Sequence, residues 1–115
     1  MRTETVTGID GDGNPISVTA SEATVLIGMK RTRMRVAAGE TTETDIDLRI
    51  LHLMTYPDLI AAVVEQSGLE WPLSFDDFCQ LPDKFVSQWE QAVYSLNPHW
   101  LPDYGETQEK KQPTS

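Results

Sequence analysis

The chain has 115 residues, enough for one domain with a single core, and its 18 acidic and nine basic residues give a net charge of −9. That charge opposes general attraction to nucleic acid phosphates or to anionic membrane surfaces. Cys79 is the only cysteine, so an intrachain disulfide and a cysteine-rich metal site are excluded, and no apolar run approaches the roughly 18 residues that span a bilayer, which predicts a soluble cytoplasmic protein.

A short N-terminal β-hairpin is predicted by the first part of the chain. Polar and apolar residues alternate from Thr5 to Val18 around the sequence DGDGNP, and Asp-Gly pairs favour tight hairpin turns. Because an isolated two-stranded ribbon is marginally stable in water, we expect residues 1–19 to form an arm beside the domain.

The same turn resembles the start of a calcium-binding loop. Asp10, Asp12 and Asn14 match its first three ligand positions. Pro15 stands where the loop needs glycine, and Ser21 stands where it needs the bidentate glutamate. The sequence therefore predicts a plain turn and no metal.

A helix over residues 22–38 is predicted next, with Ser21 as its N-cap and Gly39 as its stop. Apolar side chains recur at intervals of three and four residues, which is typical of one helix face. They are Val25, Leu26, Met29 and Val36. The β-branched residues leave a strand over residues 23–29 as the competing assignment.

The main core helix is expected after Asp45, which can cap it. Its apolar stripe is formed by Ile46, Ile50, Leu53 and Met54. Tyr56-Pro57 should break or kink this helix, because proline lacks an N–H group and disfavours helical geometry in the residue before it. Pro57 then suits the first turn of another helix that ends at Gly68.

Two further helices are predicted near the C-terminus. Ser74 can cap a short helix over residues 75–80, and Pro82 precedes a longer one that ends at Asn97. The fold class is thus mainly α, with four to five helices over residues 20–102 and a β-hairpin over residues 1–19. The polar residues 103–115 are expected to form a disordered tail.

A basic cluster contributes four of the nine positive charges. Its members are Lys30, Arg31, Arg33 and Arg35. It could bind an acidic protein surface or phosphate, although on a helix the four side chains spread over more than one face, which favours a solvated positive surface. A small regulatory nucleic-acid-binding module that uses this cluster is the alternative function.

The last helix carries most of the candidate partner-binding aromatics, which are Phe85, Trp89, Tyr94 and Trp100. The spacing of Phe85 and Trp89 is typical of a core face. Trp100 lies beyond the helix end, where an exposed tryptophan in an apolar patch can anchor a partner. Core packing and partner contact are therefore both open for these side chains.

Nothing in the sequence is arranged as an active site. His52 and His99 lack a cysteine or carboxylate at ligand spacing, and Cys79 between Phe78 and Leu81 is expected to be a buried small hydrophobe. The two carboxylate pairs Asp45/Asp47 and Asp76/Asp77 lie where helix starts are expected, as capping predicts. We therefore expect no enzyme activity, no cofactor and no metal.

Three segments together resemble small tail assembly chaperones encoded by tailed phages and prophages. They are VTASEATVLIGMKRTRM, RILHLMTYPDLIAAVVE and PLSFDDFCQLPDKFVSQWEQAVYSLNPHW, and the resemblance spans residues 18–101. It implies a mainly helical, non-enzymatic protein of the host bacterial cytoplasm. Such a protein binds the long hydrophobic helical tape measure protein before tail tube subunits polymerise around it, and it helps recruit those subunits.

The resemblance also bears on the binding surface and on the C-terminal end of the chain. An apolar helical surface around the four aromatic residues would serve as the binding surface. Members of the family can carry a frameshift-extended C-terminal form, for which the tail after Pro102 suits the junction. The oligomeric state, self-association included, is not determined by the sequence.

Overall fold

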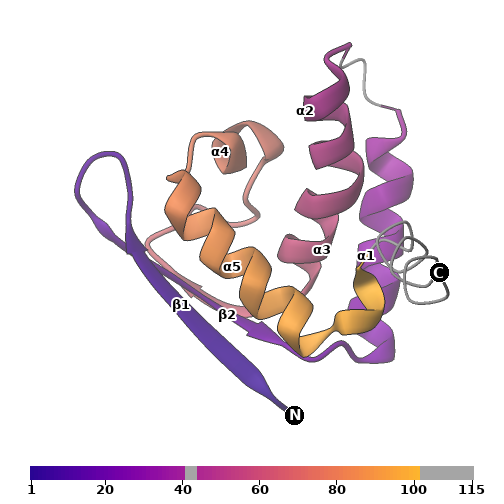
Figure 1. Ribbon diagram of the computed structural model, residues 1–115, viewed down its shortest axis with the longest axis horizontal. Coiled ribbons are helices and arrows are strands. Elements are labelled where there is room, and N and C mark those ends of the chain that lie inside the picture. Colours follow the sequence, from indigo (N-terminus) through magenta and orange to yellow (C-terminus); the bar gives the residue numbers. More distant parts are fainter. Residues whose placement is uncertain (41–43, 102–115) are drawn as a thin grey trace, which may run out of the picture.

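The computed structural model describes residues 1–40 and 44–101 as an α+β fold, a three-stranded antiparallel sheet with helices on one face (Figure 1). The strands are β1 (Thr3–Ile9), β2 (Pro15–Ser21) and β3 (Val63–Ser67), in the order β1-β2-β3. The helices are α1 (Val25–Ala38), α2 (Ile46–Ile50), α3 (Tyr56–Ala61), α4 (Phe75–Cys79) and α5 (Asp83–Leu96). A π-helical turn η1 (Leu51–Thr55) joins α2 to α3, and a 3₁₀ turn η2 (Pro98–Trp100) follows α5.

The mainly α fold class predicted from the sequence is wrong, because a third strand replaces the second half of a predicted helix. Residues 57–68 form α3 only as far as Ala61, and β3 then pairs antiparallel with β2, with Ser17 opposite Ser67. Val63 and Val64 are β-branched and fit a pleated strand better than a helix. The edge of β2 supplies the hydrogen-bonding partner that sequence periodicity cannot reveal.

The hairpin is part of the domain and not an arm. Its strand β2 is the central strand, and Ile16, Val18 and Ala20 on one side of β2 are buried in the core under α5. On the outer side of the sheet, the hydroxyl groups of Thr5 and Thr19 are hydrogen-bonded at 2.8 Å. The boundary expected between residues 19 and 20 therefore falls inside the sheet. The tail predicted over residues 103–115 lies outside the described residues.

The Asp-Gly segment forms the tight turn between β1 and β2 that its sequence predicts. One carboxylate oxygen of Asp10 accepts hydrogen bonds from the backbone N–H groups of Asp12 and Asn14, both at 2.9 Å. Gly13 has a φ of +86°, a conformation that glycine adopts without strain. The acidic and glycine residues of this segment thus shape the turn.

The helices that run antiparallel beside the sheet, α1 and the continuous α2-η1-α3 segment, form a helical hairpin (Figure 1). Thr24, and not Ser21, caps α1 by accepting the Ile27 N–H, whereas Asp45 caps α2 as predicted. The helix does not break at Pro57. The wider π-helical turn that ends at Thr55, two residues before Pro57, accommodates a residue that has no N–H group and whose ring would crowd the preceding turn.

The prediction that residues 46–54 form the main core helix is also wrong. No residue of α2 or η1 is buried. The core instead lies between the sheet, α3 and α5, and α5 contributes Phe85, Trp89, Ala92, Val93 and Leu96 as its spacing predicted. The amphipathic pattern of α2 was correct, but its apolar side faces away from the core.

A buried asparagine fastens the end of α5 to the rest of the domain. The Nδ2 atom of Asn97 donates to the carbonyls of Ser21 at 3.1 Å and Val93 at 3.2 Å, and its Oδ1 accepts the Ala23 N–H at 2.7 Å. These bonds join the end of β2, the start of α1 and the end of α5. A buried amide with its hydrogen bonds made specifies one packing arrangement.

Candidate partner-binding surface

The four aromatic residues expected to contact a partner do not form a surface. Phe85, Trp89 and Trp100 are at most 5% exposed, and Tyr94 is half-buried. The Trp89 ring packs between Phe78 and Phe85, with centroid distances of 5.8 and 5.9 Å. Phe85, Trp89 and Trp100 therefore pack in the core, which is the other interpretation that the sequence left open. The predicted partner-binding surface around these aromatic residues is wrong.

Two residues of the basic cluster are occupied by a buried carboxylate. Asp58 of α3 is 1% exposed, and its Oδ1 atom lies 2.5 Å from Arg31 Nε and 3.0 Å from Arg35 Nη2. Its Oδ2 atom accepts the Tyr94 hydroxyl at 2.7 Å. The Arg31 guanidinium also lies 4.6 Å from the centroid of the Trp100 ring. This network joins α1, α3, α5 and η2.

The other two members of the basic cluster point to solvent. Lys30 and Arg33 are exposed and make no ion pair with any residue in the ranges 1–40 and 44–101. The cluster predicted from the sequence is thus divided between structural and surface positions. Only two of its charges are available to a phosphate or an acidic side chain.

Burial, reinforced by the hydrogen bond to Asp58, raises the pKa of Tyr94 above its usual range. The unfolded tyrosine ionises near pH 10, as tyrosines usually do, whereas the folded one stays protonated. The stability contributed by this group is therefore complete below pH 10. It is lost progressively as the pH rises from 10 toward the pKa of the folded tyrosine.

We accordingly expect the free energy of unfolding to fall with rising pH above about 10, and to fall less steeply in Tyr94→Phe. Urea unfolding between pH 8 and 11 measures both slopes. Burial also raises the pKa of Tyr56, so a reduced slope should persist in the variant. If the unfolding free energy fell equally steeply with pH in both proteins, the buried hydrogen bond between Tyr94 and Asp58 would be contradicted.

Exposed apolar side chains are concentrated on the helical hairpin. Of the eleven large apolar side chains that are exposed in the described part of the chain, seven lie on α1 and α2. They are Val25, Leu26, Met29, Val36, Ile46, Leu48 and Ile50, and we call them the hairpin apolar surface. Because α2 has no buried residue at all, its apolar side chains are left in contact with solvent, as are those on the outer side of α1.

Helix geometry explains how α1 presents its share of this surface. Successive residues turn by about 100°, so Val25, Met29 and Val36 lie on one side of the helix. Ile27 and Met34 lie on the opposite side and pack against the core. Val25 and Val36 are 81% and 71% exposed, so this apolar stripe faces solvent.

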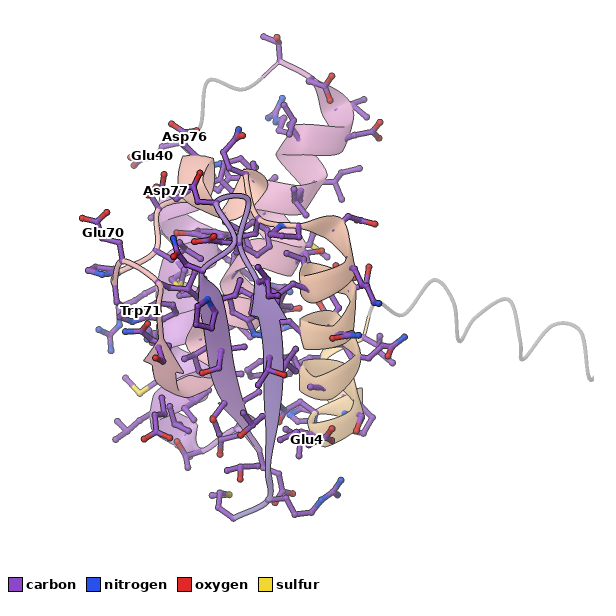
Figure 2. All side chains as sticks on the ribbon, turned by 90° about the vertical axis from the view of Figure 1, so that its left-hand side faces the viewer. Glu4, Glu40, Glu70, Trp71, Asp76 and Asp77 are labelled. Carbon is purple, nitrogen blue, oxygen red and sulfur yellow. The ribbon has the colours of Figure 1, made fainter. Side chains whose placement is uncertain are left out.

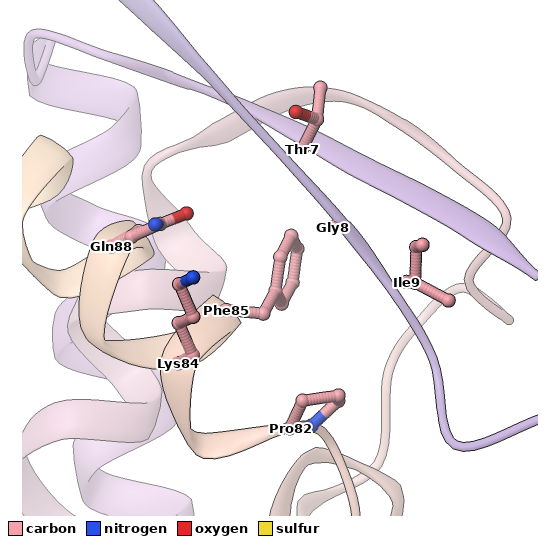
Figure 3. Close-up of a pocket in the computed structure, with 7 residues that line it drawn as sticks. All are labelled: Thr7, Gly8, Ile9, Pro82, Lys84, Phe85 and Gln88. Carbon is pink, nitrogen blue, oxygen red and sulfur yellow. The ribbon is translucent and has the colours of Figure 1, made fainter. Parts of the chain in front are cut away.

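A shallow cavity of about 350 Å³ lies between β1 and the start of α5 (Figure 3). The Phe85 ring points toward Gly8, where a Cβ atom would lie 2.6 Å from Phe85 Cδ1. Lys84 is the only ionisable residue that lines the cavity. The lining offers apolar contact but no acid and base pair.

Two other cavities gather carboxylates. One of about 480 Å³ is lined by Asp10, Asp12, Glu70 and Asp77, and Figure 2 shows Glu70 and Asp77 projecting outward. The described residues hold no group of three or more His, Cys, Asp or Glu side chains that could bind a metal ion.

Cys79 lines a cavity of about 230 Å³ with Asp83 and Glu90, where burial, with Asp83 adding to it, raises the pKa of Glu90. The Cys79 side chain is exposed, contrary to the expected buried hydrophobe, because Phe78 occupies the inward position of the short helix α4. A thiolate is stabilised by nearby positive charge, and this lining supplies carboxylates instead. His52 is half-buried and stacks on Phe75 at 4.0 Å.

Comparison with protein-family models, curated proteins and solved structures finds no match to this chain. Within residues 1–40 and 44–101, no helix combines the length and apolarity needed to cross a membrane. The chemistry of the described surface, together with the resemblance of the three segments, is therefore the basis for a functional proposal.

Sequence reasoning missed both the position of the binding candidate and the buried ion-pair network. The spacing of Val25, Met29 and Val36 was a usable signal, but periodicity does not tell which side of a helix faces the core. Asp58 had no signal, because a carboxylate after Pro57 looks like an ordinary first-turn residue. Only the tertiary arrangement brings Arg31 and Arg35 onto it.

Proposed function

We propose that this protein is a non-enzymatic tail assembly chaperone of the bacterial cytoplasm. It binds the hydrophobic helical tape measure protein before tail tube subunits polymerise around it, and it helps recruit those subunits. The observation that carries the proposal is the hairpin apolar surface on α1 and α2. The resemblance of residues 18–101 to tail assembly chaperones supplies the identity of the partner.

The physical argument rests on the unpartnered apolar side chains. Soluble monomers rarely leave large apolar patches exposed, and patches rimmed by polar residues mark interaction sites. An amphipathic helix buries its apolar side against such a surface, as in helix-in-groove recognition. The net charge of −9 keeps a complex with a hydrophobic partner soluble.

The position of α2 supports the same function. Asp45 caps this helix, and η1 continues it, so its exposed apolar side chains are held in one orientation. Burial of the Ile46 side chain against a partner would contribute roughly 1 to 2 kcal/mol to the binding free energy, and burial of Ile50 would contribute as much again. Preorganised side chains lose less conformational entropy on binding. The nucleic-acid alternative has less support, because Asp58 engages Arg31 and Arg35.

Co-expression with the tape measure protein of the same phage or prophage tests the proposal. We expect the tagged chain to co-purify that protein, and Ile46→Ser combined with Ile50→Ser to reduce the recovered amount at least tenfold, because about 2 kcal/mol of apolar burial is lost. The matched control is Ile9→Ser combined with Val64→Ser, which changes two exposed side chains outside the surface. Absence of co-purification by the unmodified chain would contradict the proposed function.

A further inference from the structure

The outer side of α1 has the form of a docking seam for one helix. We propose that it takes an amphipathic helix whose apolar stripe is flanked by aspartate and glutamate side chains; this rests on the proposed function and specifies which kind of tape measure segment is bound. Three independent features of α1 carry the inference. They are the spacing of its exposed residues, a glycine that the fold does not need, and its charge.

The exposed residues follow the spacing of a coiled-coil seam. Val25, Met29, Thr32 and Val36 are separated by four, three and four positions, and all four are exposed. This alternation keeps one line of side chains facing a single partner helix and allows knobs-into-holes packing. The Thr32 hydroxyl donates to the Gly28 carbonyl at 3.1 Å, so its polar group is already satisfied.

Gly28 lies beside this seam for no reason internal to the domain. A Cβ atom built on Gly28 would meet nothing within 4 Å, so no neighbour in the described fold requires a glycine there. Glycine inside a helix costs about 1 kcal/mol relative to alanine. Its use lies outside the domain, because the missing side chain lets another backbone approach α1 closely.

The charge of α1 selects the partner. In a chain with twice as many acidic as basic residues, α1 contains no acidic residue, and the exposed side chains of Arg33 and, further round the helix, Lys30 lie along one side of its apolar stripe. Carboxylates project elsewhere, for example from Glu70 and Asp76 (Figure 2). Two copies of α1 packed together would place basic side chains against each other, which disfavours self-association through this seam. An acidic amphipathic helix is the complementary occupant.

Gly28→Leu separates binding from folding. Because the site is open and leucine is a better helix former, we expect this variant to be at least as heat-stable as the unmodified chain. The new side chain blocks the close approach, so co-purification of the tape measure protein should fall at least tenfold. Ser87→Leu on α5 introduces the same side chain at another exposed helix position and should leave co-purification unchanged.

Charge reversal tests whether the basic side chains of α1 select an acidic partner helix. Lys30→Glu combined with Arg33→Glu should weaken tape measure binding at least tenfold at low salt, with a smaller difference at high salt. Arg2→Glu combined with Lys84→Glu changes the net charge equally, at exposed positions outside the seam, and should have little effect. Binding that both pairs weaken equally would show general electrostatic attraction and overturn the charge selection.

A photo-crosslinking residue at position 29 identifies the occupant. We expect crosslinks to a tape measure segment in which acidic residues flank an apolar stripe. The same crosslinking residue at position 9, at the end of β1, should give none. A crosslink from position 29 to a second copy of this chain would overturn the inference. If the unmodified chain binds the tape measure protein but Gly28→Leu binds equally well, the inference fails and the proposed function stands; without any binding, both fail.

Discussion

Replacing Trp89 with alanine is expected to lower the free energy of unfolding by about 4 kcal/mol, because truncating a large buried aromatic leaves a cavity. Trp89 is 0% exposed and lies between the Phe78 and Phe85 rings at the centre of the core. Urea unfolding followed by circular dichroism measures the loss. A loss below 1 kcal/mol would contradict the core position of this side chain.

Trp89→Phe is the matched control. It keeps an aromatic ring, and it removes the Nε1 atom, which is buried without a hydrogen-bond partner among the described residues. We therefore expect a loss of no more than about half that of the alanine variant. Any loss of partner binding in Trp89→Ala should follow the unfolded fraction, since this side chain contributes no exposed surface.

Asp58→Ala has the second largest expected effect, about 3 kcal/mol of unfolding free energy. Removing one partner of a buried ion pair leaves uncompensated charge, which typically costs 3 to 5 kcal/mol. The lower end applies because the side chains of Arg31 and Arg35 are 19% and 30% exposed and retain some hydration. The Tyr94 hydroxyl loses its acceptor as well. Chemical denaturation at pH 7 measures the difference.

The control for Asp58→Ala compares alanine variants of the two exposed residues of the basic cluster with alanine variants of the two that pair with Asp58. Lys30→Ala and Arg33→Ala remove exposed side chains outside the network, and each should change the unfolding free energy by no more than about 0.5 kcal/mol. Arg31→Ala and Arg35→Ala should destabilise clearly more. If all four alanine variants behaved alike, the division of the cluster into structural and surface residues would be contradicted.

Local sequence signals predicted the caps of two helices correctly, although α1 is capped by Thr24 and not by the predicted Ser21. Asp45 and Ser74 cap α2 and α4, and the inward residues of α5 follow the expected spacing. These features depend on contacts within a few residues, which a sequence displays directly. The turn at Asp10 belongs to the same category.

Long-range pairing could not be predicted in the same way. Residues 63–67 satisfy a helical pattern, and only the adjacent edge of β2 makes them a strand. Likewise, the apolar stripe that includes Val25 and Val36 is helical in spacing, but the side that meets the core depends on α3 and the Asp58 network. The candidate binding residues therefore changed from buried aromatics to exposed aliphatic side chains.

The most direct test of the proposed chaperone function is the solubility of the tape measure protein when it is expressed with and without this chain. The hairpin apolar surface predicts that most of the tape measure protein is soluble with the unmodified chain, and that it aggregates when the chain is absent or carries Ile46→Ser with Ile50→Ser. Equal solubility in all three cases would contradict the function proposed for this protein.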